Sequence, residues 1–157
     1  MRQTGGSRDE PHPGVSIDEA PVGSLLLQVI RAHARVGTRL LQEAGISPPH
    51  EIVVLYLDDH GPVPQSELVH YLGRDRSTVT ATLQAMERLG LVKRDRSPSD
   101  KRAMVVSLTA KGKALVAPIR RAWAELERLT VAPLEPGGQD RLKNALEAIR
   151  DALIESR

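Results

Sequence analysis

Apolar residues recur every three or four positions near both ends of the chain. The stripe near the amino end consists of Leu26, Val29, His33, Val36 and Leu40, and the stripe near the carboxyl end consists of Leu142, Leu146, Ile149 and Leu153. This spacing places side chains on one face of a helix. It predicts a long helix over residues 22–44 and further helices within residues 113–155. Such stripes are most often ordinary core, and contact with a partner subunit is the open alternative.

The middle of the chain carries two shorter helical patterns. The first covers residues 64–73, and the second begins after Asp75, a residue type favoured at helix N-caps, and is stopped by Gly90. Its buried face would carry Val79, Leu83 and Met86. The opposite face carries small or hydrogen-bonding side chains, namely Arg76, Ser77, Thr80, Ala81, Gln84 and Arg88. That face suits the DNA major groove, which admits a helix and is read by Arg, Gln, Ser and Thr.

A basic hairpin follows the second of these helices. Strands are predicted over residues 91–94 and 104–107, joined by a loop of residues 95–103. Residues 61–112 hold nine Lys/Arg and five Asp/Glu, a net charge of +4 in a chain whose total is only +2. A basic loop is usually just solvated, but behind a recognition-type helix it is better interpreted as a DNA contact. The fold predicted for about residues 47–112 is therefore a winged helix-turn-helix, mainly α with a small β-hairpin wing.

The wing carries an ordered motif. It runs Lys93-Arg94, then Ser97-Pro98-Ser99-Asp100-Lys101-Arg102, then Val106-Ser107-Leu108-Thr109 and Gly112. In this order the residues resemble the MarR (multiple antibiotic resistance regulator) family of winged-helix repressors, and the resemblance extends from about residue 22 to residue 153. It implies that Asp100 holds Arg102 at the hairpin tip, where the arginine enters the minor groove. The chain departs from the family at Gly137-Gly138, where relatives commonly begin a short acidic helix.

We predict that three groups of side chains contact DNA. The recognition helix would contribute Arg74, Arg76, Ser77, Thr78, Thr80, Gln84 and Arg88, and the wing would contribute Lys93, Arg94, Arg96, Asp100, Lys101 and Arg102. Gln65 and Ser66, at the start of the first helix-turn-helix element, would lie near the DNA backbone. One such unit binds half a site, so the terminal helices are expected to form a dimer. The resemblance implies the same, with dimerisation helices at about residues 22–44 and 113–155.

His33 is the polar exception on the first apolar stripe. From the residues alone it is best interpreted as a core or interface histidine with one hydrogen bond. Two further helices are predicted, a second between Pro49 and Gly61 and a fifth from an N-cap at Thr109 through Leu129. The resemblance implies an effector cavity between the first, second and fifth helices, where the family commonly binds small, often aromatic or phenolic, anions. Tyr56 and Trp123 are on helices that could face the same space as His33. We name no ligand and expect no cofactor.

Several kinds of active site are disfavoured by the residues present. The chain has no cysteine, which excludes disulfides, zinc–thiolate sites and thiol redox sensing. His50-Glu51 and Asp58-Asp59-His60 bracket the second predicted helix but lack a pair of histidines at i and i+4. They are better explained as helix-end residues, so no metal site is predicted. Convergent catalytic groups are also missing, and the chain is not expected to be an enzyme.

Residues 1–21 differ from the rest of the chain. They are rich in Gly, Pro, Ser, Asp and Arg and show no apolar period, which predicts a flexible tail ahead of a single domain over residues 22–157. The tail has no apolar segment of signal-peptide type, and no later apolar run approaches the length of a membrane span. A cytoplasmic protein is therefore expected.

These patterns together predict a homodimeric transcriptional regulator, acting as a repressor that a small-molecule effector releases from a pseudo-palindromic operator in double-stranded DNA. Two alternatives remain open at this point. An architectural DNA binder without an effector would bind many sequences with similar affinity. A winged-helix module that binds protein would carry an apolar patch on the helix that follows Asp75, where this sequence has Arg, Thr and Gln.

Overall fold

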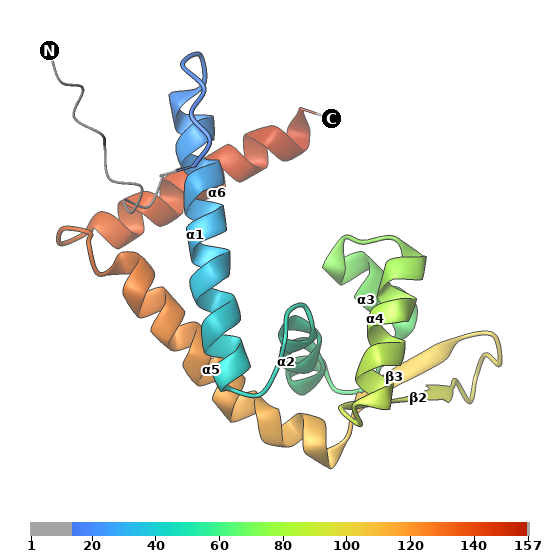
Figure 1. The fold of residues 1–157 in the computed structure, drawn as a ribbon. Coiled ribbons are helices and arrows are strands. Elements are labelled where there is room, and N and C mark those ends of the chain that lie inside the picture. The colour runs from blue at the N-terminus through green and yellow to red at the C-terminus, as the bar shows by residue number, and fades with distance from the viewer. Residues whose placement is uncertain (1–13, 157) are drawn as a thin grey trace, which may run out of the picture. The chain divides into compact units, whose positions relative to one another are not determined.

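The computed structural model describes residues 14–156 (Figure 1). By the packing of the backbone they form two compact units. One unit ends at Val36 and the other begins at Gly37, so the boundary falls inside the first helix, α1 (Pro21–Glu43). The single domain predicted over residues 22–157 stays a prediction. None of the described helices has the length and apolarity that a membrane crossing would need.

The unit that ends at Val36 joins residues 14–20 to the first turns of α1. The Ile17 N–H donates to Ser24 Oγ at 2.9 Å, and Gln28 Nε2 donates to the Val15 carbonyl at 2.7 Å. Ser24 is buried. The last residues of the predicted tail are therefore bound to α1, and the tail's first 13 residues lie outside the described residues.

The unit that begins at Gly37 contains the remaining elements. They are α2 (His50–His60), β1 (Val63–Pro64), α3 (Gln65–Leu72), α4 (Arg76–Arg88), β2 (Val92–Arg96), β3 (Met104–Leu108), α5 (Ala110–Val131) and α6 (Gly138–Glu155). The two short helices, α3 and α4, are the predicted helix-turn-helix, and the hairpin β2–β3 projects beside α4 (Figure 1). This architecture, mostly helical with a small sheet, is the predicted fold class.

The sheet has three antiparallel strands in the order β1-β3-β2. Val92 of β2 pairs with Leu108 of β3, and Val63 of β1 pairs with Val106. The third strand corrects the predicted two-stranded hairpin, since Pro64 was expected to begin a helix. β2 also runs two residues further than predicted, so the loop at the wing tip covers only residues 97–103.

One apolar core holds the helix-turn-helix, the sheet and α2 and α5 together. Its fully buried members come from every layer: Val53, Val54, Leu68, Val79, Leu83, Met86, Val106 and Ile119. The predicted buried face of the recognition helix is confirmed, because Val79, Leu83 and Met86 are each at most 1% exposed. The polar face of α4 is consequently turned away from the core.

The start of α5 is bonded to the turn that follows α4. Thr109 caps α5, since its Oγ1 accepts the Gly112 N–H at 3.1 Å. The same hydroxyl reaches the Gly90 carbonyl at 2.5 Å, and Lys111 Nζ donates to the Leu89 carbonyl at 2.7 Å. These bonds fix the end of the recognition helix to the base of the wing and to the beginning of α5.

Candidate nucleic-acid interface

The recognition helix α4 is capped at its amino end by Asp75, the predicted N-cap residue. Asp75 Oδ1 accepts the Thr78 N–H at 2.9 Å and the Ser77 hydroxyl at 2.5 Å, while Oδ2 accepts the Thr78 hydroxyl at 2.6 Å. The hydrogen bonds from Ser77 and then from Thr78 hold the pKa of the Asp75 carboxyl well below its ordinary value. Ser77 and Thr78 thus orient the cap as well as standing on the predicted DNA-facing side.

This cap leads to a prediction for Asp75→Ala and Asp75→Asn. Because Asn keeps an acceptor for the Thr78 N–H and Ala does not, Asp75→Ala should lower the melting temperature by roughly 4 °C at pH 7, and Asp75→Asn by less. The depressed pKa of Asp75 stabilises the folded state above the unfolded pKa near 4, and this stabilisation is lost as the pH falls below it.

Melting curves from pH 7 to pH 3 check both parts. Asp75→Asn should show a weaker loss of stability on acidification than the wild type, since its amide does not titrate. A wild type and an Asn variant with the same pH dependence would contradict the role of the charged cap.

The side of α4 that is predicted to face DNA is exposed. Five of its candidate residues are exposed, namely Arg76, Ser77, Thr78, Gln84 and Arg88, and so is Arg74 in the turn before the helix. Thr80 is half-buried beside Gln65 of α3, whose Nε2 donates to Thr80 Oγ1 at 2.9 Å. Gln65 therefore joins the two helices of the motif, while its neighbour Ser66 is exposed.

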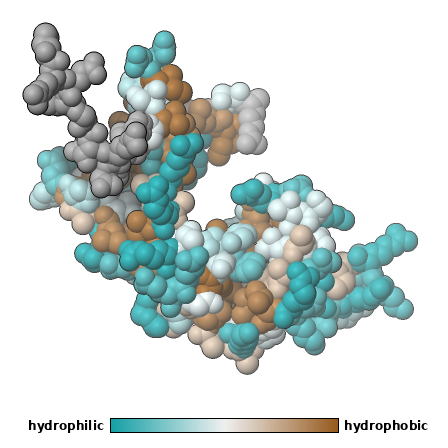
Figure 2. All heavy atoms as spheres, viewed as in Figure 1, coloured by the Kyte–Doolittle hydropathy of each residue, from teal (hydrophilic) through white to brown (hydrophobic). Residues whose placement is uncertain are grey.

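The wing is hydrophilic over its projecting end (Figure 2). Asp100 Oδ1 accepts the backbone N–H of Arg102 at 2.9 Å, which shapes the loop and leaves the Arg102 guanidinium exposed. Arg96 Nη1 donates to the Lys101 carbonyl at 3.3 Å, and Lys93 pairs with Asp95 at 3.0 Å. Asp100 thus holds the Arg102 main chain at the turn, and the arginine side chain extends from it.

Arg94 is placed differently from the other basic residues of the wing. Its Nε and Nη2 donate to Glu87 Oε2 at 3.1 and 2.9 Å, and its side chain is only 15% exposed. This ion pair ties β2 to the last turn of α4. Glu87 could not be identified from local sequence signals, because its pairing with Arg94 depends on the turn at Gly90 that brings the two elements together.

The three residues proposed for an effector cavity belong to different units. His33 lies in the unit that ends at Val36, whereas Tyr56 and Trp123 lie in the other. The Tyr56 hydroxyl donates to Glu67 Oε1 at 2.6 Å, and its ring stacks on His60 with the centroids 4.1 Å apart. The hydrogen bond to Glu67 raises the pKa of Tyr56. The effector role of these residues stays a prediction.

Three of the polar residues that bracket α2, namely Asp58, Asp59 and His60, have structural partners. Arg120 of α5 donates to Asp58 at 3.0 Å and to Asp59 at 2.7 Å, which ties α5 to α2. His60 Nδ1 lies 2.9 Å from the Tyr56 carbonyl. Glu51 is buried, and burial raises its pKa. Over residues 14–156 no group of three or more His, Cys, Asp or Glu side chains is arranged to hold a metal ion.

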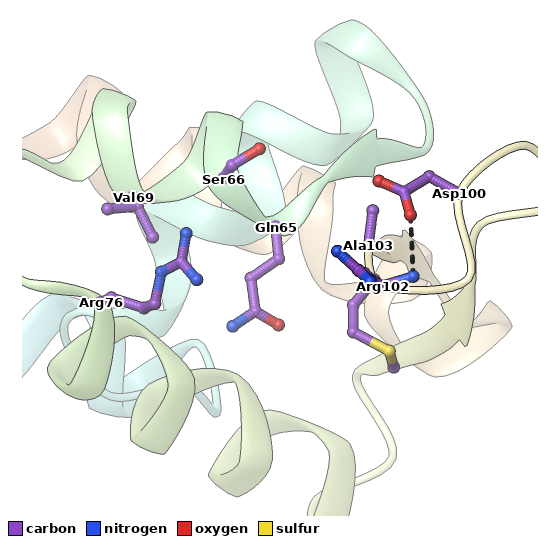
Figure 3. A pocket seen from close by; sticks show the side chains of 8 residues that line it. Gln65, Ser66, Val69, Arg76, Asp100, Arg102 and Ala103 are labelled. Atoms are coloured by element: carbon purple, nitrogen blue, oxygen red, sulfur yellow. Dashed lines mark hydrogen bonds between the residues drawn. The ribbon is translucent and has the colours of Figure 1, made fainter.

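A cavity of about 370 Å³ lies where the helix-turn-helix meets the wing. Its walls include Gln65 and Ser66 of α3, Arg76 of α4, and Asp100 and Arg102 of the wing. Figure 3 shows the Gln65 side chain between Arg76 on one side and Arg102 on the other. The cavity thus gathers, in one place, residues from all three predicted groups of DNA contacts.

Comparison with known proteins supports this description. Residues 44–103 match the model of the MarR family. The repressor NicR of Pseudomonas putida is 25% identical over 116 residues, which cover 74% of this chain and 73% of NicR. The solved structure of the repressor CouR bound to a 23-mer DNA duplex is 28% identical, with a TM-score of 0.78 over 87% of this chain and 99% of CouR. The regulator PcaV of Streptomyces coelicolor, solved with its natural ligand, shares the fold at 23% identity and a TM-score of 0.76 over 89% of this chain and 99% of PcaV.

Proposed function

Because this chain belongs to the MarR family of winged-helix transcriptional regulators, we propose that it is a homodimeric repressor of a pseudo-palindromic operator. Each subunit places α4 in a major groove and its wing against the neighbouring backbone and minor groove. A small organic effector releases the dimer from DNA by changing the distance between the two recognition helices. That distance must match about one turn of DNA, roughly 34 Å, or a multiple of it.

The observation that carries the proposal is the unpaired positive charge around α4. Among the described residues, six basic side chains of α4, of the turn before it and of the wing take part in no ion pair: Arg74, Arg76, Arg88, Arg96, Lys101 and Arg102. Basic side chains in this arrangement neutralise phosphates and release counterions. Ser77, Thr80 and Gln84 add hydrogen-bonding groups for base edges between them.

Two residues of the predicted contact set are assigned positioning roles. Arg94, held by Glu87, would fix the angle of the wing relative to α4 instead of gripping the DNA backbone. Gln65, bonded to Thr80, would fix α3 against the recognition helix and lie near the DNA backbone with Ser66. The remaining residues of the set keep their predicted contacts with DNA.

Dimerisation is supported by apolar side chains that each unit leaves exposed. Val22, Leu25, Val29 and Ile30 of α1 are more than half exposed, and so are Leu153 and Ile154 of α6. Exposed apolar side chains that recur along a helix in this way are typical of an interaction site. A second copy of the chain is the natural partner, because one helix-turn-helix reads only half of a symmetric operator.

Effector control is supported by the relatives. PcaV was solved with its natural ligand, and NicR is named as a repressor. The effector residues of the proposal are those that the sequence indicated, His33, Tyr56 and Trp123. The Tyr56–Glu67 bond provides a direct link from α2 to the first helix of the DNA-binding motif. A ligand that draws the Tyr56 hydroxyl away from Glu67 would loosen that link.

Selection from random duplex DNA at about 150 mM salt tests the function. We expect recovery of an inverted repeat whose half-sites are about one helical turn apart, bound about 10³-fold or more tightly than unselected DNA. Sequencing the retained duplexes and titrating the consensus gives both quantities.

Each other outcome of the selection contradicts a stated part of the proposal. Retained DNA without a common sequence would replace the operator model with an architectural DNA binder. A chain that retains no DNA at any salt concentration would favour a winged-helix module that binds protein. Recovery of single, unrepeated half-sites would contradict the dimer and keep the sequence-specific function.

A further inference from the structure

The cavity between α3, α4 and the wing lies on the path that bound DNA must take. If α4 enters a major groove and the wing tip reaches the adjacent minor groove, the sugar–phosphate strand that separates those grooves has to pass between them. The cavity occupies this place, since its walls come from Arg76 at the first turn of α4, from Gln65 and Ser66 of α3, and from Arg102 at the wing tip (Figure 3). Its volume of about 370 Å³ is many times the roughly 30 Å³ that one water takes in the liquid.

The charges that face this cavity favour an anion. Arg76 and Arg102 both line it, and neither forms an ion pair among the described residues. Asp100 is the acidic residue of the wall, but its Oδ1 is turned to the backbone N–H of Arg102, 2.9 Å away. Two guanidinium groups therefore share the cavity with one carboxylate, which leaves a net positive charge. A phosphate between them would replace repulsion of like charges with two charge-assisted contacts.

A second observation points to the same place. Gln65 Oε1 is buried and has no hydrogen-bond partner among the described residues, while the Nε2 of the same amide is held by Thr80. A buried acceptor of this kind requires a donor. A guanidinium has five N–H donors in a planar fork, enough to serve a phosphate oxygen and the Gln65 carbonyl together.

We propose that this cavity seats a single phosphodiester of the strand between the two grooves, and that Arg76 and Arg102 hold the same phosphate from opposite sides. Gln65 acts as a positioning residue. The hydrogen bond from its Nε2 to Thr80 fixes the amide against α4, and its Oε1 then orients one of the two guanidinium groups. Arg102 accordingly contacts the backbone of the strand that borders the minor groove. The inference rests on the proposed DNA-binding function.

Methylphosphonate substitution tests the shared phosphate. A series of operator duplexes, taken from the selection described above, carries one neutral methylphosphonate linkage each, at successive positions along the strand. Affinities are measured for the wild type, Arg76→Ala, Arg102→Ala and the control Arg121→Ala, an exposed arginine of α5. On unmodified DNA we expect each of the first two variants to bind about tenfold more weakly, and the control to bind like the wild type.

The decisive result is the position at which these losses vanish. At one linkage in each half-site, neutralisation should weaken the wild type and reduce the effect of both Arg76→Ala and Arg102→Ala to less than about twofold. The proposal of a shared phosphate is wrong if the losses caused by the two alanine variants disappear at different linkages. It is also wrong if the loss caused by Arg102→Ala depends only on the bases of the minor groove. A wild type that selects no operator contradicts the proposed function itself, so the two failures are distinguishable.

The positioning role of Gln65 has its own readout. Gln65→Glu keeps an acceptor but adds a negative charge to the seat, whereas Gln65→Met removes the amide and keeps the chain length. We expect Gln65→Glu to weaken binding to unmodified DNA by more than Gln65→Met, and to regain affinity relative to the wild type on the duplex with the critical methylphosphonate. Equal losses for both variants on every duplex would show that Gln65 acts only in packing. Melting temperatures of all variants identify any that fail to fold.

Discussion

Gly112→Ala is expected to lower the free energy of unfolding by about 3 kcal/mol. A Cβ at this position would lie 2.2 Å from the Leu91 carbonyl oxygen and 3.0 Å from Leu108 Cδ2. The carbonyl cannot retreat easily, because it accepts the Thr109 N–H at 3.1 Å and the Leu91 side chain is buried. The start of α5 would have to move away from the base of the wing. Urea unfolding at 25 °C measures the loss.

Gly23→Ala is the matched control for this substitution. Gly23 is also helical, in α1, but its added Cβ would meet nothing closer than the Ala20 Cβ at 3.7 Å. Alanine is the better helix former, so Gly23→Ala should leave stability unchanged or raise it slightly. If Gly112→Ala were as stable as Gly23→Ala, the close approach of α5 to the wing would be wrong.

The sequence was most informative where a local chemical signal coincides with an element boundary. Asp75 caps α4, Thr109 caps α5, and Gly90 has the positive φ of 72° that ends a helix. Each residue acts through its own backbone or its nearest neighbours, so its effect is visible in a short window of sequence. The burial of Val79, Leu83 and Met86 was predictable for the same reason, since helical periodicity is local.

The features that sequence analysis missed depend on contacts between distant segments. β1 has only two residues, one of them Pro64, and no alternation of its own; it exists because β3 provides partners for it. Short strands of this kind are therefore poorly specified by local signals.

Candidate site residues show the same limit. The motif around Asp100 and Arg102 identified the wing, but the residues on each side of it could not be sorted by role. Arg94 and Arg102 are both basic wing residues, yet Arg94 is held by Glu87 and Arg102 lines the cavity beside Arg76. Their different roles follow from which side of the hairpin faces α4. Only the folded arrangement separates a residue that positions the wing from one that is available to DNA.

Leu146→Glu is expected to convert the protein from a dimer to a monomer and to weaken operator binding by about 100-fold. Leu142, Leu146, Ile149 and Leu153 form one face of α6 and are 37%, 44%, 37% and 65% exposed. If a second copy covers this face, a carboxylate at position 146 would be buried without a partner in both subunits. Asn144→Glu, which adds the same charge at an exposed polar position of α6, should leave the dimer intact.

Light scattering coupled to gel filtration gives the mass, and titration of the operator gives the affinity. The folded monomer should still prefer the half-site sequence, because its recognition helix and wing are unchanged, and this preference separates loss of the dimer from loss of the fold. A Leu146→Glu protein with the mass of the wild-type dimer would remove α6 from the interface. A wild type that is itself monomeric would overturn the homodimer, and the apolar face of α6 would then require a different partner.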